Sequence, residues 1–157
     1  MATPEQSNRG QLPGIVSREF DQQAPQFVSD PKDIPWALSH FSQSGAMTWA
    51  VREGDLREFW IIERSPLEVE VNVRIVAGTI GGTVGQLLYV RLPFARVAAH
   101  GSGTLGIGFD NAAFTPIAVY TEPGEDRIRI ARSDFANWTA GTMSAQFQIT
   151  VRTVAQR

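Results

Sequence analysis

The residues that could do acid–base or metal chemistry are few, because the chain holds two histidines and no cysteine. His40 and His100 lie far apart and show none of the short His-x-His or His-x-x-x-His spacings typical of metal sites. A hydrolase-like triad could be drawn from His100, Ser102 and Asp110, but the sequence has no nucleophile elbow and no recognisable oxyanion hole. We therefore expect a protein that is not an enzyme and that carries no cofactor or histidine metal site.

Three polar pairs fall in expected turns, namely Asp110–Asn111, Glu125–Asp126 and Ser133–Asp134. Carboxylates in such pairs can bind calcium, but in turns they more often accept local backbone hydrogen bonds, which is the role we expect. Two glycine-rich stretches, residues 78–85 and 101–108, lack the helix and lysine of a phosphate-binding loop. They predict turns and close strand packing.

An aromatic side chain in a loop is a further candidate, because its face can stack on a sugar ring. Trp138 fits this role best, since Asp134 and Asn137 lie in the same expected loop. A tryptophan of a β-domain is more often part of the core or of an interface. Both interpretations stay open, and the possible glycan contacts are Trp138, Asp134, Asn137 and His100.

The element most clearly written in the sequence is a strand over residues 67–77. Its alternate positions are apolar, at Leu67, Val69, Val71, Val73 and Ile75, and the positions between them are polar. Because side chains alternate across a strand, one face of this strand is expected in the core and the other in water.

Similar patterns with turn residues between them predict about eight strands, and no helical stretch separates them. Parallel strands would need crossover helices, so the sheet is expected to be antiparallel. The predicted fold class is therefore all-β, an antiparallel two-sheet sandwich of jelly-roll type. We expect this β-sandwich domain to span residues 46–157.

Residues 1–45 differ from the rest, because they hold five prolines and apolar residues without a period. Prolines rule out a continuous helix or a central strand, so the segment reads as a disordered tail or an extended arm. The number of apolar residues favours an arm that packs on its own domain or on a neighbouring subunit. The expected anchors are Leu12, Ile15, Val16, Phe20, Phe27 and Trp36.

Two expected strands are apolar on both faces, at residues 59–62 and 87–90. Covering several such side chains could drive association, because each is worth roughly 1.5–3 kcal/mol when buried. The alternative is that the arm or long loops of the same chain cover them. We expect a homo-oligomer, in the form of a trimer, with an interface at Phe59, Trp60, Leu87 and Tyr89.

The composition excludes two classes of partner. The net charge is −2 and no basic block occurs, which argues against a surface that follows nucleic-acid phosphates. No apolar run reaches the length of a membrane span, so membrane insertion is not expected.

The order of segments resembles a known group of proteins. It runs from Gln86–Ala95, with its Leu-Pro-Phe stop, through a glycine-punctuated hairpin and Arg127–Ile130 to a tryptophan loop and a last strand, Met143–Val154. This order resembles the small β-sandwich domains of tailed-bacteriophage virions, found in head fibres, decoration proteins and tail-fibre tips, often as trimers. The resemblance covers roughly residues 42–154.

The resemblance implies a structural role in the virion. The chain would be a surface or decoration protein that its N-terminal arm anchors to the major capsid protein or another virion protein. The second role it implies is a carbohydrate- or receptor-binding module of a tail fibre or head fibre, with a host-surface glycan as its partner.

Overall fold

The computed structural model describes residues 28–154, which are all-β and contain no α-helix. Its strands are β1 (Lys32–Asp33), β2 (Phe41–Gln43), β3 (Met47–Ala50), β4 (Leu56–Ser65), β5 (Glu68–Gly82), β6 (Leu88–Arg91), β7 (Ser102–Asp110), β8 (Ala113–Thr121), β9 (Arg127–Arg132) and β10 (Gly141–Arg152). Three 3-10 turns join them: η1 (Leu38–His40), η2 (Glu53–Asp55) and η3 (Pro93–Ala95). No described helix is long or apolar enough to cross a membrane.

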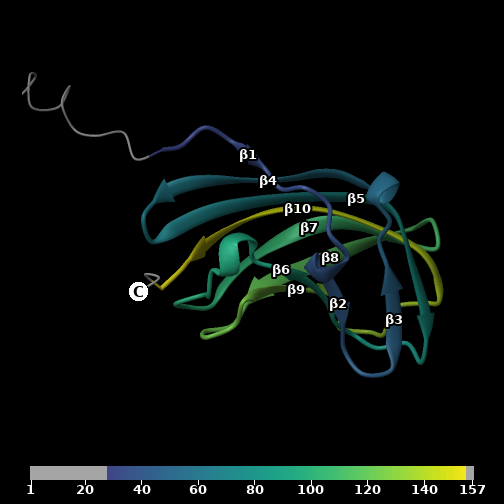
Figure 1. Cartoon of the computed structure of the whole chain (residues 1–157). Coiled ribbons are helices and arrows are strands. Elements are labelled where there is room, and N and C mark those ends of the chain that lie inside the picture. Colours follow the sequence, from purple (N-terminus) through teal and green to yellow (C-terminus); the bar gives the residue numbers. More distant parts are fainter. Residues whose placement is uncertain (1–27, 155–157) are drawn as a thin grey trace, which may run out of the picture.

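The described strands form one curled sheet in which all pairings are antiparallel (Figure 1). The order is β1-β4-β5-β10-β7-β8-β9-β6-β2, and β3 pairs with the far end of β5. Because β2 pairs with β6 while β3 pairs with β5, the β2–β3 connection links the two sides of the curl. The antiparallel all-β prediction is confirmed.

The finer prediction of two separate jelly-roll sheets is not confirmed, because hydrogen bonds join ten strands in a single sheet. The length of β5 explains the difference. It pairs with β4 through residues 68–75 and with β3 through residues 79–82, while β10 occupies its other edge. A register shift between Met143 and Ala145 marks a bulge in the β10 pairing, and bulges increase local bending and twist.

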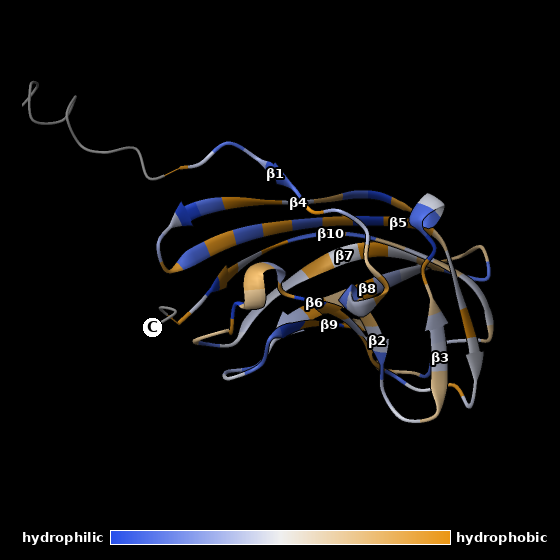
Figure 2. Ribbon diagram, viewed as in Figure 1, coloured by the Kyte–Doolittle hydropathy of each residue, from blue (hydrophilic) through white to orange (hydrophobic). Residues whose placement is uncertain are grey.

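The inner face of the curl holds the core. The alternate residues of β5 predicted to face inward are buried, as are their counterparts on β10 and on the facing strands. They include Val69, Val71, Val73, Ile75, Phe147, Ile149, Val151, Leu88, Val90, Ile117, Ile128 and Ile130. Hydrophobic and hydrophilic residues alternate along β5 (Figure 2). Leu67 differs from the prediction and is 45% exposed, because it lies in the turn before β5 begins.

Two polar residues of β5 are buried although their positions predicted contact with water. Glu70 accepts hydrogen bonds from Arg64, and Asn72 donates one to Glu58 over 3.0 Å. Both partners belong to β4, the neighbouring strand. The long polar side chains of β4 therefore cover this part of β5 and satisfy its buried groups.

The first described residues pack on the same domain. Ser29 donates its backbone N–H to the Glu63 carbonyl over 3.0 Å, and β1 pairs with β4. Ile34 is part of the core, and Trp36 donates its indole N–H to the Val51 carbonyl over 2.9 Å. Of the expected arm anchors, Trp36 is thus tied to its own chain. The others lie outside the described residues: Leu12, Ile15, Val16, Phe20 and Phe27.

The connection between β7 and β8 is a two-residue turn. Asp110 pairs with Ala113, and the residues between them, Asn111 and Ala112, have φ angles of 49° and 65°. Positive φ at both positions defines the type I′ turn that suits a β-hairpin. Alanine pays a steric cost in this left-handed conformation that glycine does not.

We expect Ala112→Gly to raise the free energy of unfolding by about 0.5–1 kcal/mol, because relief of the strain exceeds the added freedom of the unfolded chain. Denaturant unfolding measures the change. Ala113→Gly is the matched control, since Ala113 begins a strand and glycine should weaken it. Equal effects at the two positions would contradict the assignment of strain to the turn.

Candidate interaction surface on the outer face of the sheet

The outer face of β7 carries large apolar side chains because glycines occupy its inner face. A Cβ on Gly106 would lie 2.9 Å from the Phe147 Cβ, and one on Gly108 would lie 2.7 Å from the Ile117 Cγ2. Side chains essentially never approach this closely. The core therefore presses directly on the β7 backbone, and Leu105, Ile107 and Phe109 point outward instead.

These residues form an exposed apolar stripe, which we define as Leu105, Ile107, Phe109 and Phe114. Their exposed fractions are 75%, 53%, 40% and 63% respectively. Phe114 belongs to β8 and pairs with Phe109 in register, and the two rings meet edge to face with centroids 5.8 Å apart. Such contacts are favourable and fix the rings relative to each other.

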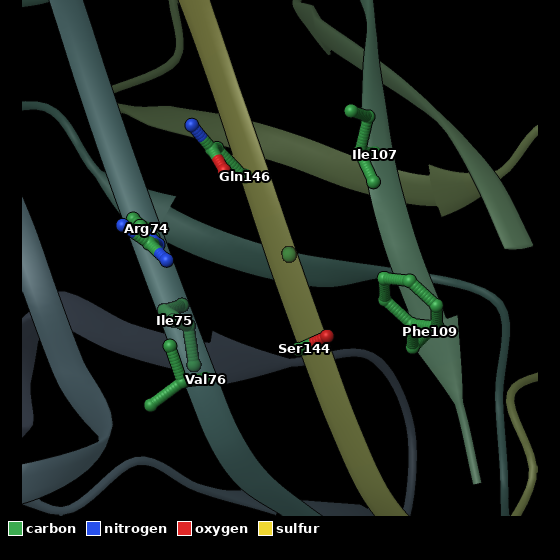
Figure 3. Close-up of a pocket in the computed structure, with 8 residues that line it drawn as sticks. Arg74, Ile75, Val76, Ile107, Phe109, Ser144 and Gln146 are labelled. Atoms are coloured by element: carbon green, nitrogen blue, oxygen red, sulfur yellow. The ribbon is translucent and has the colours of Figure 1, made fainter. Parts of the chain in front are cut away.

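A groove runs along the outer face of β10, beside the stripe. Its middle section is a hollow of about 180 Å³ between Val76 of β5 and Ile107 and Phe109 of β7, with Ser144 and Gln146 of β10 between them (Figure 3). Further hollows continue it toward Thr142 at one end and Gln148 at the other. The groove exists because the outward side chains of β10 are short or polar, whereas those of the neighbouring strands β5 and β7 project further from the sheet.

The far side of the groove is polar. Arg74 and Glu58 form an ion pair over 3.5 Å, and both side chains are more than a third exposed. Exposed pairs of this kind contribute little to stability, on the order of 0–1 kcal/mol. Their significance lies in placing one positive and one negative group at the border of the surface.

The residues expected to form a subunit interface do not make a common exposed patch. Phe59 and Tyr89 are buried within the described chain, and Trp60 and Leu87 are half-buried. The Tyr89 ring is also covered by Arg127, whose guanidinium carbon lies 4.2 Å from its centroid. Their place in an interface stays a prediction, while the exposed apolar surface of the sheet lies on β7 and β8.

The residues considered for glycan contact are also divided. Trp138 is 1% exposed and donates its indole N–H to the Gln86 carbonyl over 3.1 Å, so its ring faces are not free for stacking. Asp134, Asn137 and His100 are exposed. Arg132 donates two hydrogen bonds to Asp134, and these lower the pKa of that carboxyl.

The three residues of the hydrolase-like triad, His100, Ser102 and Asp110, do not lie together. Ser102 and Asp110 are the first and last residues of β7, which separates them by roughly 25 Å at the usual rise of a strand. Asp110 is buried and accepts hydrogen bonds from Arg132 and from the Thr139 backbone, each over 3.0 Å. These hydrogen bonds connect Asp110 to the loop that carries Trp138.

His40 lies in η1 and packs edge to face on Phe59, with ring centroids 5.4 Å apart. Burial, followed by the charge of Arg91, lowers its pKa. Among the described residues, no group of three or more histidine or acidic side chains is placed to hold a metal ion.

The turn between β8 and β9 holds a compact ion-pair network. Arg129 donates two hydrogen bonds to Glu125, of 2.7 and 2.9 Å, and Arg127 donates two more, of 3.2 and 3.5 Å. These hydrogen bonds lower the pKa of Glu125 from 4.5 to about 2, and the bonds from Arg129 have the largest effect. The sequence predicted an acidic turn here, but it did not show that two arginines of β9 bind the Glu125 carboxylate.

The lowered pKa of Glu125 predicts a pH dependence of stability. Its contribution is fully present above the unfolded pKa of 4.5 and is lost as pH falls through the folded value of about 2. Between these limits, the free energy of unfolding should fall more steeply for the natural chain than for Glu125→Gln. Denaturant unfolding at several pH values measures the two slopes, and parallel curves would refute the role of this network.

A scan against protein-family models, a search of curated proteins and a search of solved structures found no match to this chain.

Proposed function

We propose that this chain is a structural protein of a phage virion, on the capsid surface. It assembles as a homo-oligomer, with a trimer as the closed form, and residues before Val28 attach it to the major capsid protein or another virion protein. The proposal joins the resemblance to small jelly-roll-like virion domains with the surface described above. It assigns the chain an architectural role.

The apolar stripe is the observation that carries this proposal. Aromatic side chains each have roughly 150–250 Å² of surface and aliphatic ones somewhat less. The exposed fractions of the stripe residues, with 37% for Val76, therefore leave on the order of 500 Å² of apolar surface in water. That is within the range of the largest patches on soluble monomers, roughly 300–600 Å², which often mark contact sites. Burying it would be worth on the order of 10 kcal/mol before the costs of association.

The start of the described chain supports a separate role for residues 1–27. Val28 is 55% exposed, and the next residue is hydrogen-bonded to β4 beside Glu63. The 27 preceding residues can span at most roughly 90 Å from this edge, which is ample for contact with a neighbouring protein. In this proposal their apolar residues are the anchors.

Deleting residues 1–27 tests the attachment, because this cut leaves Ile34 and Trp36 in place. We expect the shortened chain to keep its β-sheet circular dichroism and its thermal transition. It should no longer cosediment with purified virions of the phage that encodes it, whereas the full chain should. Full occupancy of virions by the shortened chain would show that residues 1–27 are not the anchor, and absence of the full chain from virions would overturn the proposed function.

A glycan array tests the alternative role as a receptor-binding module. Asp134, Asn137 and His100 are exposed and available for polar contacts, while the buried ring of Trp138 offers no stacking face. A structural protein should bind no glycan on the array. Specific binding that Asn137→Ala abolishes would favour the receptor-binding role.

A further inference from the structure

We propose that the apolar stripe is the contact between copies of this chain, so that the β7 strands of neighbouring copies pack against one another. This inference deepens the proposed function, because it assigns the stripe to a second copy and leaves attachment to the particle to residues 1–27. Three properties of the surface support it: its shape, its area and its distribution of charge.

Most of the stripe is a line along β7, with Phe114 beside it on β8. Leu105, Ile107 and Phe109 follow one another at every second position of β7, so they project from the same face at intervals of roughly 7 Å. Beside them in register on β8 lie Ala118, Pro116 and Phe114. Identical lines on neighbouring copies have the same spacing, so they can face one another around a three-fold axis and bring like apolar side chains together.

The area agrees with what a specific contact between subunits needs. Each partner in a standard interface buries about 800 Å², and somewhat more than half of that area is apolar. The stripe with Val76 exposes on the order of 500 Å² of apolar surface. It therefore supplies the apolar part of one side of such an interface, and the groove along β10 supplies polar surface next to it.

The surface lacks charged groups at its centre and has them at its border, as a typical protein interface does. The outward side chains of the described β7, β8 and β10 segments around the stripe include no charged group. They are Leu105, Ile107, Phe109, Phe114, Pro116, Ala118, Ser144, Gln146 and Gln148.

Charged groups begin at the border of this uncharged area, where Arg74 pairs with Glu58 on one side and Arg129 with Glu125 on the other. Each border holds both signs, so neither border presents a charge of a single sign to a second copy. A partner of strong single charge would find no complement on this surface.

The test compares two equally drastic substitutions at exposed leucines. Leu105 is 75% exposed within the stripe, and Leu38 is 65% exposed on η1 outside it. Sedimentation velocity over a range of concentrations should show the natural chain and Leu38→Glu as oligomers. Leu105→Glu should dissociate at concentrations about 30-fold higher or more, the loss expected for a central contact residue.

A cysteine variant gives a second measurement that does not depend on disrupting the surface. The chain has no cysteine, so a single introduced thiol has only its copy in another chain as a partner. Ile107→Cys should be linked to its copy by a short bifunctional thiol reagent, because the β7 lines meet, whereas Leu38→Cys should not. Sheets packed face to face lie about 10 Å apart, beyond the roughly 7 Å between Cα atoms that a direct disulfide tolerates, so a short reagent is needed to bridge the two thiols.

The outcomes separate this inference from the proposed function. A natural chain that stays monomeric, or an oligomer that Leu105→Glu leaves unchanged, would overturn the inference even if virions contain the chain. If Leu105→Glu loses its thermal transition, the cysteine variants decide: cross-linking at position 107 alone upholds the contact, and its absence refutes it. If virions lack the chain while the stripe contact forms in solution, only the proposed function is refuted.

Discussion

Replacing Trp138 with alanine is expected to lower the free energy of unfolding by about 3–5 kcal/mol, the usual cost of removing a buried tryptophan. The side chain is 1% exposed, and its indole N–H donates to the Gln86 carbonyl over 3.1 Å. Alanine would leave a cavity and an unpaired carbonyl between the 133–140 loop and the end of the β5–β6 connection. Because small domains are stable by roughly 5–15 kcal/mol, this single change removes a large fraction of the total.

Phe135→Ala is the matched control for this prediction. Phe135 lies in the same loop but is 57% exposed, so its loss should change the free energy of unfolding by no more than about 0.5 kcal/mol. Urea unfolding of both variants measures the difference. A Trp138→Ala variant as stable as the natural chain would contradict the packing of the ring in the core. The expected loss also means that Trp138→Ala would not report on glycan contact, because any lost binding would follow from lost structure.

The second large effect is expected at Gly108, where alanine should lower the free energy of unfolding by about 1–3 kcal/mol, the typical cost of overpacking. The added Cβ would lie 2.7 Å from the Ile117 Cγ2 and 2.8 Å from the Thr115 backbone carbonyl. A backbone atom cannot move aside as the end of a flexible side chain can. Strands β7 and β8 would have to separate, with loss of core packing under Ile117.

Gly103→Ala tests the same substitution on the same strand without the clash. Its Cβ would lie no closer than 3.7 Å to the Val119 carbonyl, which is ordinary contact. This variant should be neutral or more stable by about 0.4–1 kcal/mol, because alanine restricts the unfolded chain. Thermal unfolding of the pair separates steric pressure at Gly108 from a general effect of glycine in a strand. Equal destabilisation at both positions would argue against direct contact of the core with the β7 backbone.

Local patterns predicted the strands well. Alternation across residues 67–77 placed Val69, Val71, Val73 and Ile75 in the core, where they lie in the structure. The same reasoning left open which face of β7 is inward. Leu105, Ile107 and Phe109 shared one side of a strand, but alternation says only that they share a side, and not which side is inward.

The apolar residues on both faces of other strands led to an interface prediction at Phe59 and Tyr89. Alternation could not show that the same chain covers these side chains, because the cover comes from segments distant in sequence. For Tyr89 part of it is Arg127, on the neighbouring strand β9. A signal for the apolar stripe was nevertheless present: glycines opposite large residues on one strand indicate that the glycine side is the close-packed one.

The sequence by itself determined that this protein is an antiparallel β-domain, because side-chain alternation and turn chemistry act over a few residues. Only the tertiary structure decided that the strands close into one curled sheet, that Trp138 is buried, and that the large side chains of β7 face outward. The last of these features depends on how closely Ile117 and Phe147 approach the β7 backbone, which is a distance between strands. Such distances follow from the packing of the whole core, and no short stretch of sequence contains them.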